Sequence, residues 1–143
     1  MTTKPNILLV DEDLPVRQAL ERALSVENFQ VVFAATGHEA VQQFGEYHID
    51  VLLLGLNSRN DGGWDTVLRL TALKPLLPVI ITTARPGQPT TENARAVDAW
   101  MEKPLNLPVL VQTLNELASQ TPDVRRRLVN ERPADAGNSF LHL

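Results

Sequence analysis

The chain alternates short apolar runs with longer amphipathic segments. Apolar runs at 7–10, 30–34, 51–54 and 79–81 are each bounded by turn or polar residues, and a weaker run follows at 99–102. The first four are rich in consecutive Val, Ile and Leu instead of alternating with polar residues. They predict strands that are covered on both faces, as in a parallel sheet.

The segments between the runs carry apolar residues at helical spacing. Offsets of three and four residues give each segment one apolar face. These positions are Val16, Leu20, Ala23 and Leu24; Ala40, Val41 and Phe44; Val67, Leu68 and Ala72; and Leu107, Leu110, Val111, Leu114 and Leu117. A further stretch, 90–97, is polar and predicts a loosely packed helix. Strands that alternate with helices indicate an open α/β sheet with helices on both faces.

The periodic pattern ends near Ser119, which divides the chain into two parts. We expect one domain over residues 1–120 and a flexible tail or truncated linker over 121–143. The second part holds an Arg triplet at 125–127 and few apolar groups, a composition that burial orders poorly. We interpret the triplet as a solvated helix end, with contact to an acidic partner or to phosphates as the alternative.

Composition narrows the classes of protein. The 143 residues include no Cys, and 17 acidic against 13 basic side chains give a net charge of −4. The absence of Cys excludes disulfide scaffolds and thiolate metal sites, and mild acidity gives no general attraction for nucleic acid. No apolar run approaches the ~20 residues of a membrane span, and no signal-peptide pattern begins the chain. We therefore expect a cytoplasmic protein.

Three adjacent acids, Asp11, Glu12 and Asp13, follow the first predicted strand. Ligands of open α/β folds bind beyond the carboxyl ends of the strands. Neighbouring carboxylates there repel one another unless a divalent cation or a Lys lies among them, or unless their pKa values rise. The alternative is that Asp13 caps the following helix while Asp11 and Glu12 face solvent. The acids alone leave both interpretations open.

The ends of two later strands add complementary groups. Thr82 and Thr83 end the fourth predicted strand, and Lys103 follows the fifth. Carboxylates, a hydroxyl and an ammonium at one edge of a sheet would suit Mg²⁺ and phosphate. The three His residues accompany no plausible nucleophile, and the chain has neither a GxGxxG nor a Walker loop. We therefore expect no enzyme, including a flavin or nucleotide enzyme on the same architecture.

Segments 7–13, 78–84 and 100–105 resemble the receiver domain of two-component response regulators, over about residues 5–119. The resemblance implies a flavodoxin-like, doubly wound sheet of five parallel strands in the order 2-1-3-4-5, which acts in signal transduction within a phosphorelay. In active members the first-strand acids hold Mg²⁺, and an Asp at the end of the third strand accepts a phosphoryl group. Thr83 would contact the phosphoryl oxygen and Lys103 would neutralise its charge.

The expected acceptor Asp is missing. When the loop after the third strand is aligned with Gly63 on the family's glycine, the acceptor position falls on Gly55, and Arg59 replaces the expected Pro. Glycine offers no nucleophile, so the covalent step cannot occur there. The sequence predicts a pseudo-receiver with no catalytic residue. A backbone that needs positive φ is a second explanation for Gly55.

The implied metal site loses the same carboxylate. The resemblance assigns Mg²⁺ to Asp11, Glu12 and the backbone carbonyl of Asn57, alongside the missing acceptor. We expect weak Mg²⁺ binding, because such sites depend on their few carboxylates, and no other cofactor. Lys103 is then expected to pair directly with Asp11 or Glu12.

Two alternative interpretations retain phosphorylation as part of the protein's function. Another acid, such as Asp13 or Asp61, could accept the phosphoryl group, or the chain could be an active receiver that carries an Asp-to-Gly change. The first requires attack from a loop position several ångströms away, where correct positioning is worth ~7–11 kcal/mol.

Trp100 occupies the position of the family's switch aromatic. We expect it to be partly buried, with its edge available to a protein partner or to a second copy through the face around the fourth and fifth helices. Trp64 is expected to open the third helix and pack locally. The chain has no basic groove-reading helix, so we expect no contact with nucleic acid or membrane.

Overall fold

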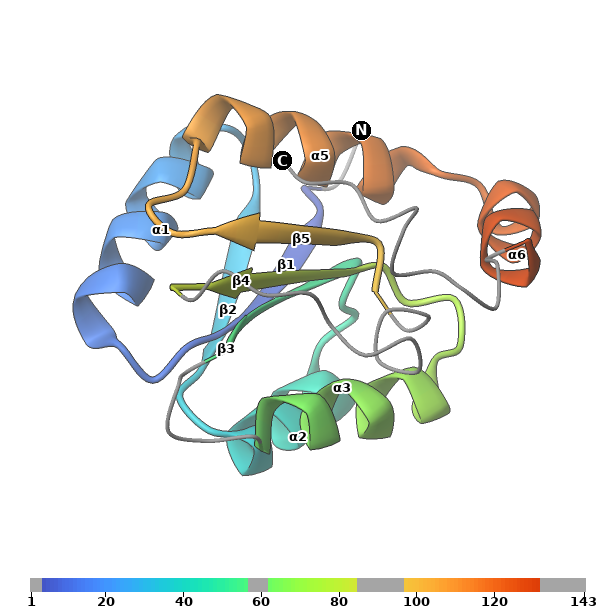
Figure 1. Cartoon of the computed structure of the whole chain (residues 1–143), viewed down its shortest axis with the longest axis horizontal. Coiled ribbons are helices and arrows are strands. Elements are labelled where there is room, and N and C mark those ends of the chain that lie inside the picture. Colours follow the sequence, from blue (N-terminus) through green and yellow to red (C-terminus); the bar gives the residue numbers. More distant parts are fainter. Residues whose placement is uncertain (1–3, 57–61, 85–96, 132–143) are drawn as a thin grey trace.

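A computed structural model of the 143-residue chain describes residues 4–56, 62–84 and 97–131. In this part of the chain, five parallel strands form one sheet in the order β2-β1-β3-β4-β5 (Figure 1). The order confirms the flavodoxin-like arrangement expected from the sequence. The strands are β1 (Asn6–Val10), β2 (Gln30–Ala34), β3 (Val51–Leu56), β4 (Val79–Thr83) and β5 (Ala99–Glu102).

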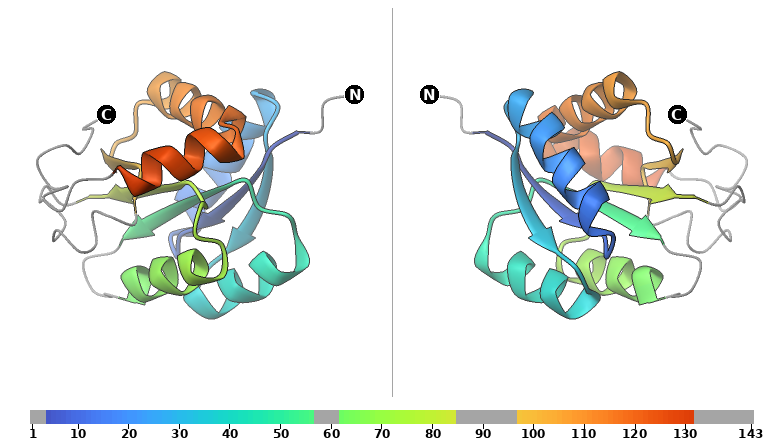
Figure 2. Two further views of the ribbon diagram at one scale, coloured as in Figure 1. Left: turned by 90° about the vertical axis from the view of Figure 1, so that its right-hand side faces the viewer. Right: turned by 90° about the vertical axis from the view of Figure 1, so that its left-hand side faces the viewer.

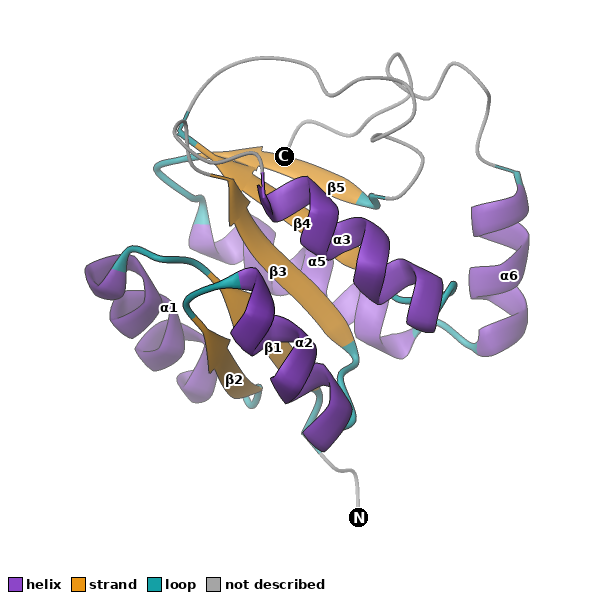
Figure 3. Cartoon of the chain, turned by 90° about the horizontal axis from the view of Figure 1, so that it is seen from below, coloured by secondary structure: helices purple, strands orange, loops and turns teal. Residues whose placement is uncertain are grey.

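Helices cover both faces of the sheet. α1 (Leu14–Val26) and α5 (Leu107–Ser119) lie on one face, and α2 (Gly37–Glu46) and α3 (Gly62–Leu73) lie on the other (Figures 1 and 3). The helix expected at 90–97 falls outside the described residues except for Val97, which is buried. No helix in the described ranges is long and apolar enough to cross a lipid bilayer.

Successive residues of the strands supply two apolar layers. Leu9, Leu53 and Ile80 stand side by side in register and pack with Leu114 of α5. Leu54, the next residue along β3, belongs to the opposite layer under α2 and α3. All five are almost fully buried, and each contributes about 1.5–3 kcal/mol from the hydrophobic effect.

The parallel register brings the carboxyl ends of the strands to one edge of the sheet. Val10 stands opposite Leu54, and Gly55 stands opposite Thr82. Thr82 in turn stands opposite Met101, two residues before Lys103. Residues that follow these strands are therefore neighbours, although they are far apart in the sequence.

Two of the helices begin at polar caps close to this edge. The Asp13 side chain accepts a hydrogen bond from the backbone N–H of Val16 at 3.2 Å and caps α1. Asn106 caps α5 in the same way through the N–H of Val109 at 3.2 Å. Such caps satisfy backbone donors that the first helical turn leaves unpaired. The capping role considered for Asp13 is confirmed, and Glu12 is exposed as that interpretation expected, but Asp11 is buried and does not face solvent.

Part of the segment expected as a flexible tail or truncated linker, 121–143, has regular structure. Residues Pro122–Asn130 form α6, which lies near the start of β5 (Figures 1 and 2). Arg125 of this helix is 4% exposed, so the Arg triplet is not a wholly solvated helix end. The remainder of the expected tail, 132–143, falls outside the described residues.

Candidate functional site

Asp11 is the acid at the centre of the candidate site. It directly follows β1, where its N–H donates to the carbonyl of Ala34 at 3.1 Å. Its side chain is 7% exposed, which removes the carboxylate from most of the solvent. A carboxylate in such surroundings needs hydrogen-bond or charge partners.

Both carboxylate oxygens of Asp11 have a partner. Oδ2 accepts from Nζ of Lys103 at 3.0 Å, and Oδ1 accepts from the N–H of Asp13 at 2.9 Å. The backbone N–H of Lys103 donates to the carbonyl of Thr83 at 2.7 Å, which fixes the Lys103 backbone beside the end of β4. The direct ion pair expected for Lys103 is therefore present, and Asp11 is its acid.

Gly55 lies directly against this carboxylate. A Cβ at position 55 would overlap Oδ2 of Asp11, would lie 2.9 Å from its Cγ, and would lie 3.4 Å from Oγ1 of Thr82. None of the glycines within the described ranges has positive φ. The conformational explanation for Gly55 is therefore wrong. The Asp11 carboxylate occupies the space in which a side chain at position 55 would begin.

The structure describes two of the other residues expected at the pocket, Glu12 and Thr83. Glu12 is exposed, and Thr83 is 6% exposed at the end of β4. Asn57 and Asp61 lie outside the described residues. Within the described residues, the structure brings Asp11, Gly55 and Lys103 of the expected set together, and Thr83 meets Lys103 through its backbone carbonyl.

These residues do not fit a magnesium ion well. Among the described residues, no group of three or more His, Cys, Asp or Glu side chains is placed to hold a metal. Position 55 supplies no carboxylate, and a cation would have to displace the Lys103 ammonium from Asp11. Mg²⁺ prefers near-octahedral oxygen ligands and loses its waters reluctantly, which makes this exchange unfavourable.

A cavity of about 250 Å³ opens beside Gly55 on the side of α2 and α3. Its lining includes Thr36 and His38 at the start of α2, and Thr66 and Arg69 on α3. The sequence did not single out these residues as a site. Thr36 and His38 come after an edge strand, Thr66 and Arg69 lie within α3, and neither pair belongs to a motif.

Trp100 is enclosed more fully than the sequence suggested. It is 6% exposed within the apolar layer that faces α2 and α3. The ring of Trp64, at the start of α3, stacks on it with a centroid separation of 6.1 Å and an interplanar angle of 18°. Stacked aromatic pairs at this distance are stabilising. The expectation of an available edge is corrected, and the packing of Trp64 joins α3 to β5.

A sequence profile described as the response regulator receiver domain matches residues 7–115. The transcriptional regulatory protein ZraR of Salmonella typhimurium is 29% identical over 94% of this chain and 31% of its own length. PrrA of Mycobacterium tuberculosis is 31% identical over 80% of this chain and 50% of its own length. The chain thus spans half or less of these two relatives.

Solved structures give the same fold. A response regulator receiver domain protein from Methanospirillum hungatei aligns with a TM-score of 0.72 at 22% identity, covering 87% of this chain and 98% of that chain. TrrA from Thermotoga maritima, in complex with Mg(2+)-BeF, aligns with a TM-score of 0.72 at 23% identity, covering 79% and 98%. At these identities the likeness establishes the fold alone.

Proposed function

This chain belongs to the family of response regulator receiver domains, and we propose that it is a member that works without phosphorylation at the usual position. It signals through protein contact and is not an enzyme. The observation that carries the proposal is Gly55, which has no nucleophile and against which the Asp11 carboxylate is packed. Removing the nucleophile removes the covalent step.

The charge state of the pocket supports the same proposal. In the pseudo-receiver, Lys103 neutralises Asp11 at a distance of 3.0 Å, a role that otherwise falls to a cation or an incoming group. The contact is partly enclosed, with Lys103 22% and Asp11 7% exposed, so water screens it less than a surface pair. In this proposal the ion pair takes the place that Mg²⁺ would hold beside Asp11.

The proposed partner is another protein or a second copy of this chain. The surface is the one around the fourth helix expected from the family and α5. Trp100 itself is buried and offers no edge to a partner. Leu107 at the start of α5 is 40% exposed and offers apolar contact. No nucleic-acid or membrane contact is proposed for this domain. The proposal includes a cytoplasmic location, which suits a chain without Cys.

One alternative keeps phosphorylation and has an observation in its favour. Asp11 presents a carboxylate to the space beside Gly55, close to the Lys103 ammonium. It could accept a phosphoryl group in place of the missing Asp, although it would first have to leave both of its present hydrogen-bond donors. Asp13 is the weaker candidate, because it caps α1.

The deciding experiment is incubation with a small-molecule phosphodonor and Mg²⁺, followed by intact-mass analysis. We expect no added phosphoryl group, while a receiver domain that has an acceptor Asp, treated in the same batch, gains one. A stoichiometric gain of one group on this chain would overturn the proposal. The Asp11→Asn variant would then report whether Asp11 carries the group.

The variant Gly55→Asp tests the pocket itself. A new carboxylate beside Asp11 forces that side chain to rotate away from Lys103, because the two would otherwise overlap. Labelling of this variant would mean that the rest of the pocket still supports the chemistry and that the acceptor alone was lost. Absence of labelling would mean that the surrounding loop no longer supports it.

A further inference from the structure

α6 is held to the domain mainly by one charged residue. Arg125 is the buried residue of this helix, with 4% of its surface exposed. The apolar residues are less enclosed, since Val124 and Val129 are half-buried and Leu128 is 41% exposed. A helix that buries so little apolar surface gains little from the hydrophobic effect. The polar contacts of Arg125 therefore decide whether α6 docks.

The Arg125 guanidinium joins several segments of the chain. Nη1 donates to Oδ1 of Asp98 at 2.6 Å, and Nη2 donates to Oδ2 at 3.4 Å. Nε donates to the carbonyl of Leu76 at 3.0 Å, and Nη1 also donates to Oε1 of Gln120 at 3.0 Å. A two-pronged contact between a guanidinium and a carboxylate fixes orientation as well as distance. The position of α6 is therefore well defined.

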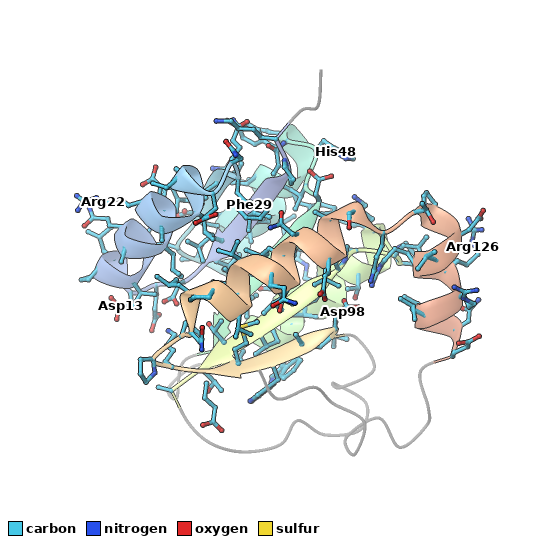
Figure 4. The ribbon with its side chains drawn as sticks, turned by 90° about the horizontal axis from the view of Figure 1, so that it is seen from above. Asp13, Arg22, Phe29, His48, Asp98 and Arg126 are labelled. Carbon is cyan, nitrogen blue, oxygen red and sulfur yellow. The ribbon has the colours of Figure 1, made fainter. Side chains whose placement is uncertain are left out.

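Asp98 connects this contact to the sheet. It stands directly before β5 (Figure 4). Its Oδ2 accepts from the N–H of Val79 at 2.8 Å, and its own N–H donates to the carbonyl of Val79 at 2.8 Å. The same carboxylate thus contacts the starts of β4 and β5 and the helix α6. A shift of β5 at Asp98 disturbs the contacts that hold α6.

The Arg125 and Asp98 pair is nearly enclosed, with side chains 5% and 9% exposed. Removing two charges from water offsets much of their attraction, so a complete buried pair stabilises a fold only modestly. Loss of one member of the pair lowers the stability of the fold much more, because the other charge stays buried without its partner. Such a contact favours a fully docked or a fully undocked α6 over intermediate positions.

We propose that Arg125 and Asp98 form a latch that couples the docking of α6 to the position of β5, the strand that carries Trp100 and leads to Lys103. When α6 leaves, Asp98 loses the guanidinium and the start of β5 loosens. A partner that shifts β5 releases α6 in turn, because coupling between two sites is reciprocal. This inference goes beyond the proposed function and does not depend on whether the domain accepts a phosphoryl group.

Hydrogen exchange measured by mass spectrometry on the full chain tests the latch. Arg125→Met keeps an unbranched stem and removes the guanidinium. We expect exchange in 122–130 and in 97–102 to rise by roughly tenfold or more, as when a buried charge is left unpaired, with exchange in β1 and α2 unchanged. Asp98→Asn is expected to raise exchange in the same two regions.

Arg126→Met is the matched control. Arg126 is on the same helix, is 59% exposed, and pairs with Asp123 on the outward side (Figure 4). We expect no change of exchange in 97–102 for this variant. Faster exchange of α6 with unchanged β5 in Arg125→Met would overturn the coupling, and unchanged exchange in both regions would overturn the latch.

A milder variant covers the case in which Arg125→Met unfolds the whole domain. Arg125→Lys keeps the charge and loses the two-pronged contact, so smaller increases are expected in the same two regions. In a Trp64→Phe background Trp100 is the remaining tryptophan, and its fluorescence is expected to be quenched more strongly by acrylamide after Arg125→Lys. An increase of exchange confined to α6, with unchanged quenching, would contradict the proposal.

Discussion

The contacts of Asp11 direct its carboxylate into the space beside Gly55. The carboxylate is directed by the Asp13 N–H and by the Lys103 ammonium, and this direction places Oδ2 where a side chain at 55 would begin. The sequence indicates that the nucleophile is missing. It does not indicate what fills the space, because that depends on the rotamer of a residue on a different strand.

Substitution of Gly55 by Ala tests this contact at the scale of one methyl group. The new Cβ forces Asp11 away from Lys103, so we expect a loss of about 1–3 kcal/mol in the free energy of unfolding, as for other overpacked sites. Urea denaturation measures it. Gly45→Ala is the control, because nothing lies within 4 Å of a Cβ there, and a gain of about 0.5–1 kcal/mol is expected in the helix. Equal effects of the two substitutions would contradict the packing of Asp11 on Gly55.

At the scale of elements, one short segment builds both the site and a helix. Asp11 supplies the buried carboxylate, and Asp13, two residues later, caps α1. The N–H of Asp13 also donates to Asp11, so the first turn of α1 is attached to the pocket. The exposed Glu12 between them takes part in neither contact. The acidic run that suggested a metal site is therefore mostly explained by a cap and an ion pair.

Replacement of Asp13 by Ala separates these roles. It removes the cap of α1, and we expect a loss of about 1 kcal/mol of stability, within the usual 0.5–2 kcal/mol for such caps. Thermal or urea unfolding measures the loss. Glu12→Ala, at the neighbouring exposed position, is expected to change stability by less than about 0.5 kcal/mol. A larger loss from Glu12→Ala than from Asp13→Ala would mean that Glu12 carries a structural contact of its own.

At the scale of the whole molecule, the strand order was predictable and the C-terminal helix was not. Continuous apolar runs predict parallel strands with helical connections, and the resemblance to receiver domains supplied their order. α6 docks through Arg125, whose partner Asp98 is 27 residues away, and a charged residue gives no sign in the sequence that it will be buried. The stack of Trp64 on Trp100 was not predicted either, because it joins two elements that share no sequence pattern.

Shortening the chain to end at Gln120 tests whether α6 belongs to the cooperative unit. Removal of α6 takes the guanidinium from Asp98 and also admits water to the carboxylate. The expected loss of stability is therefore about 1–3 kcal/mol, below the ~3–5 kcal/mol of a fully enclosed unpaired charge. Urea unfolding of the two chains measures it. If α6 were an independent tail, the two chains would unfold at the same urea concentration.

The effect of Asp98→Asn on stability should be much smaller in the shortened chain than in the full chain. In the full chain the substitution leaves Arg125 without a carboxylate and destabilises the fold. In the shortened chain the guanidinium is already absent, and the amide oxygen still accepts from the N–H of Val79, as Oδ2 of Asp98 does now. The substitution is therefore expected to cost little stability there. Residues in direct contact are the ones whose effects fail to add. The same effect of Asp98→Asn in both chains would mean that Arg125 and Asp98 contribute independently to stability. The docking of α6 would then not be coupled to β5.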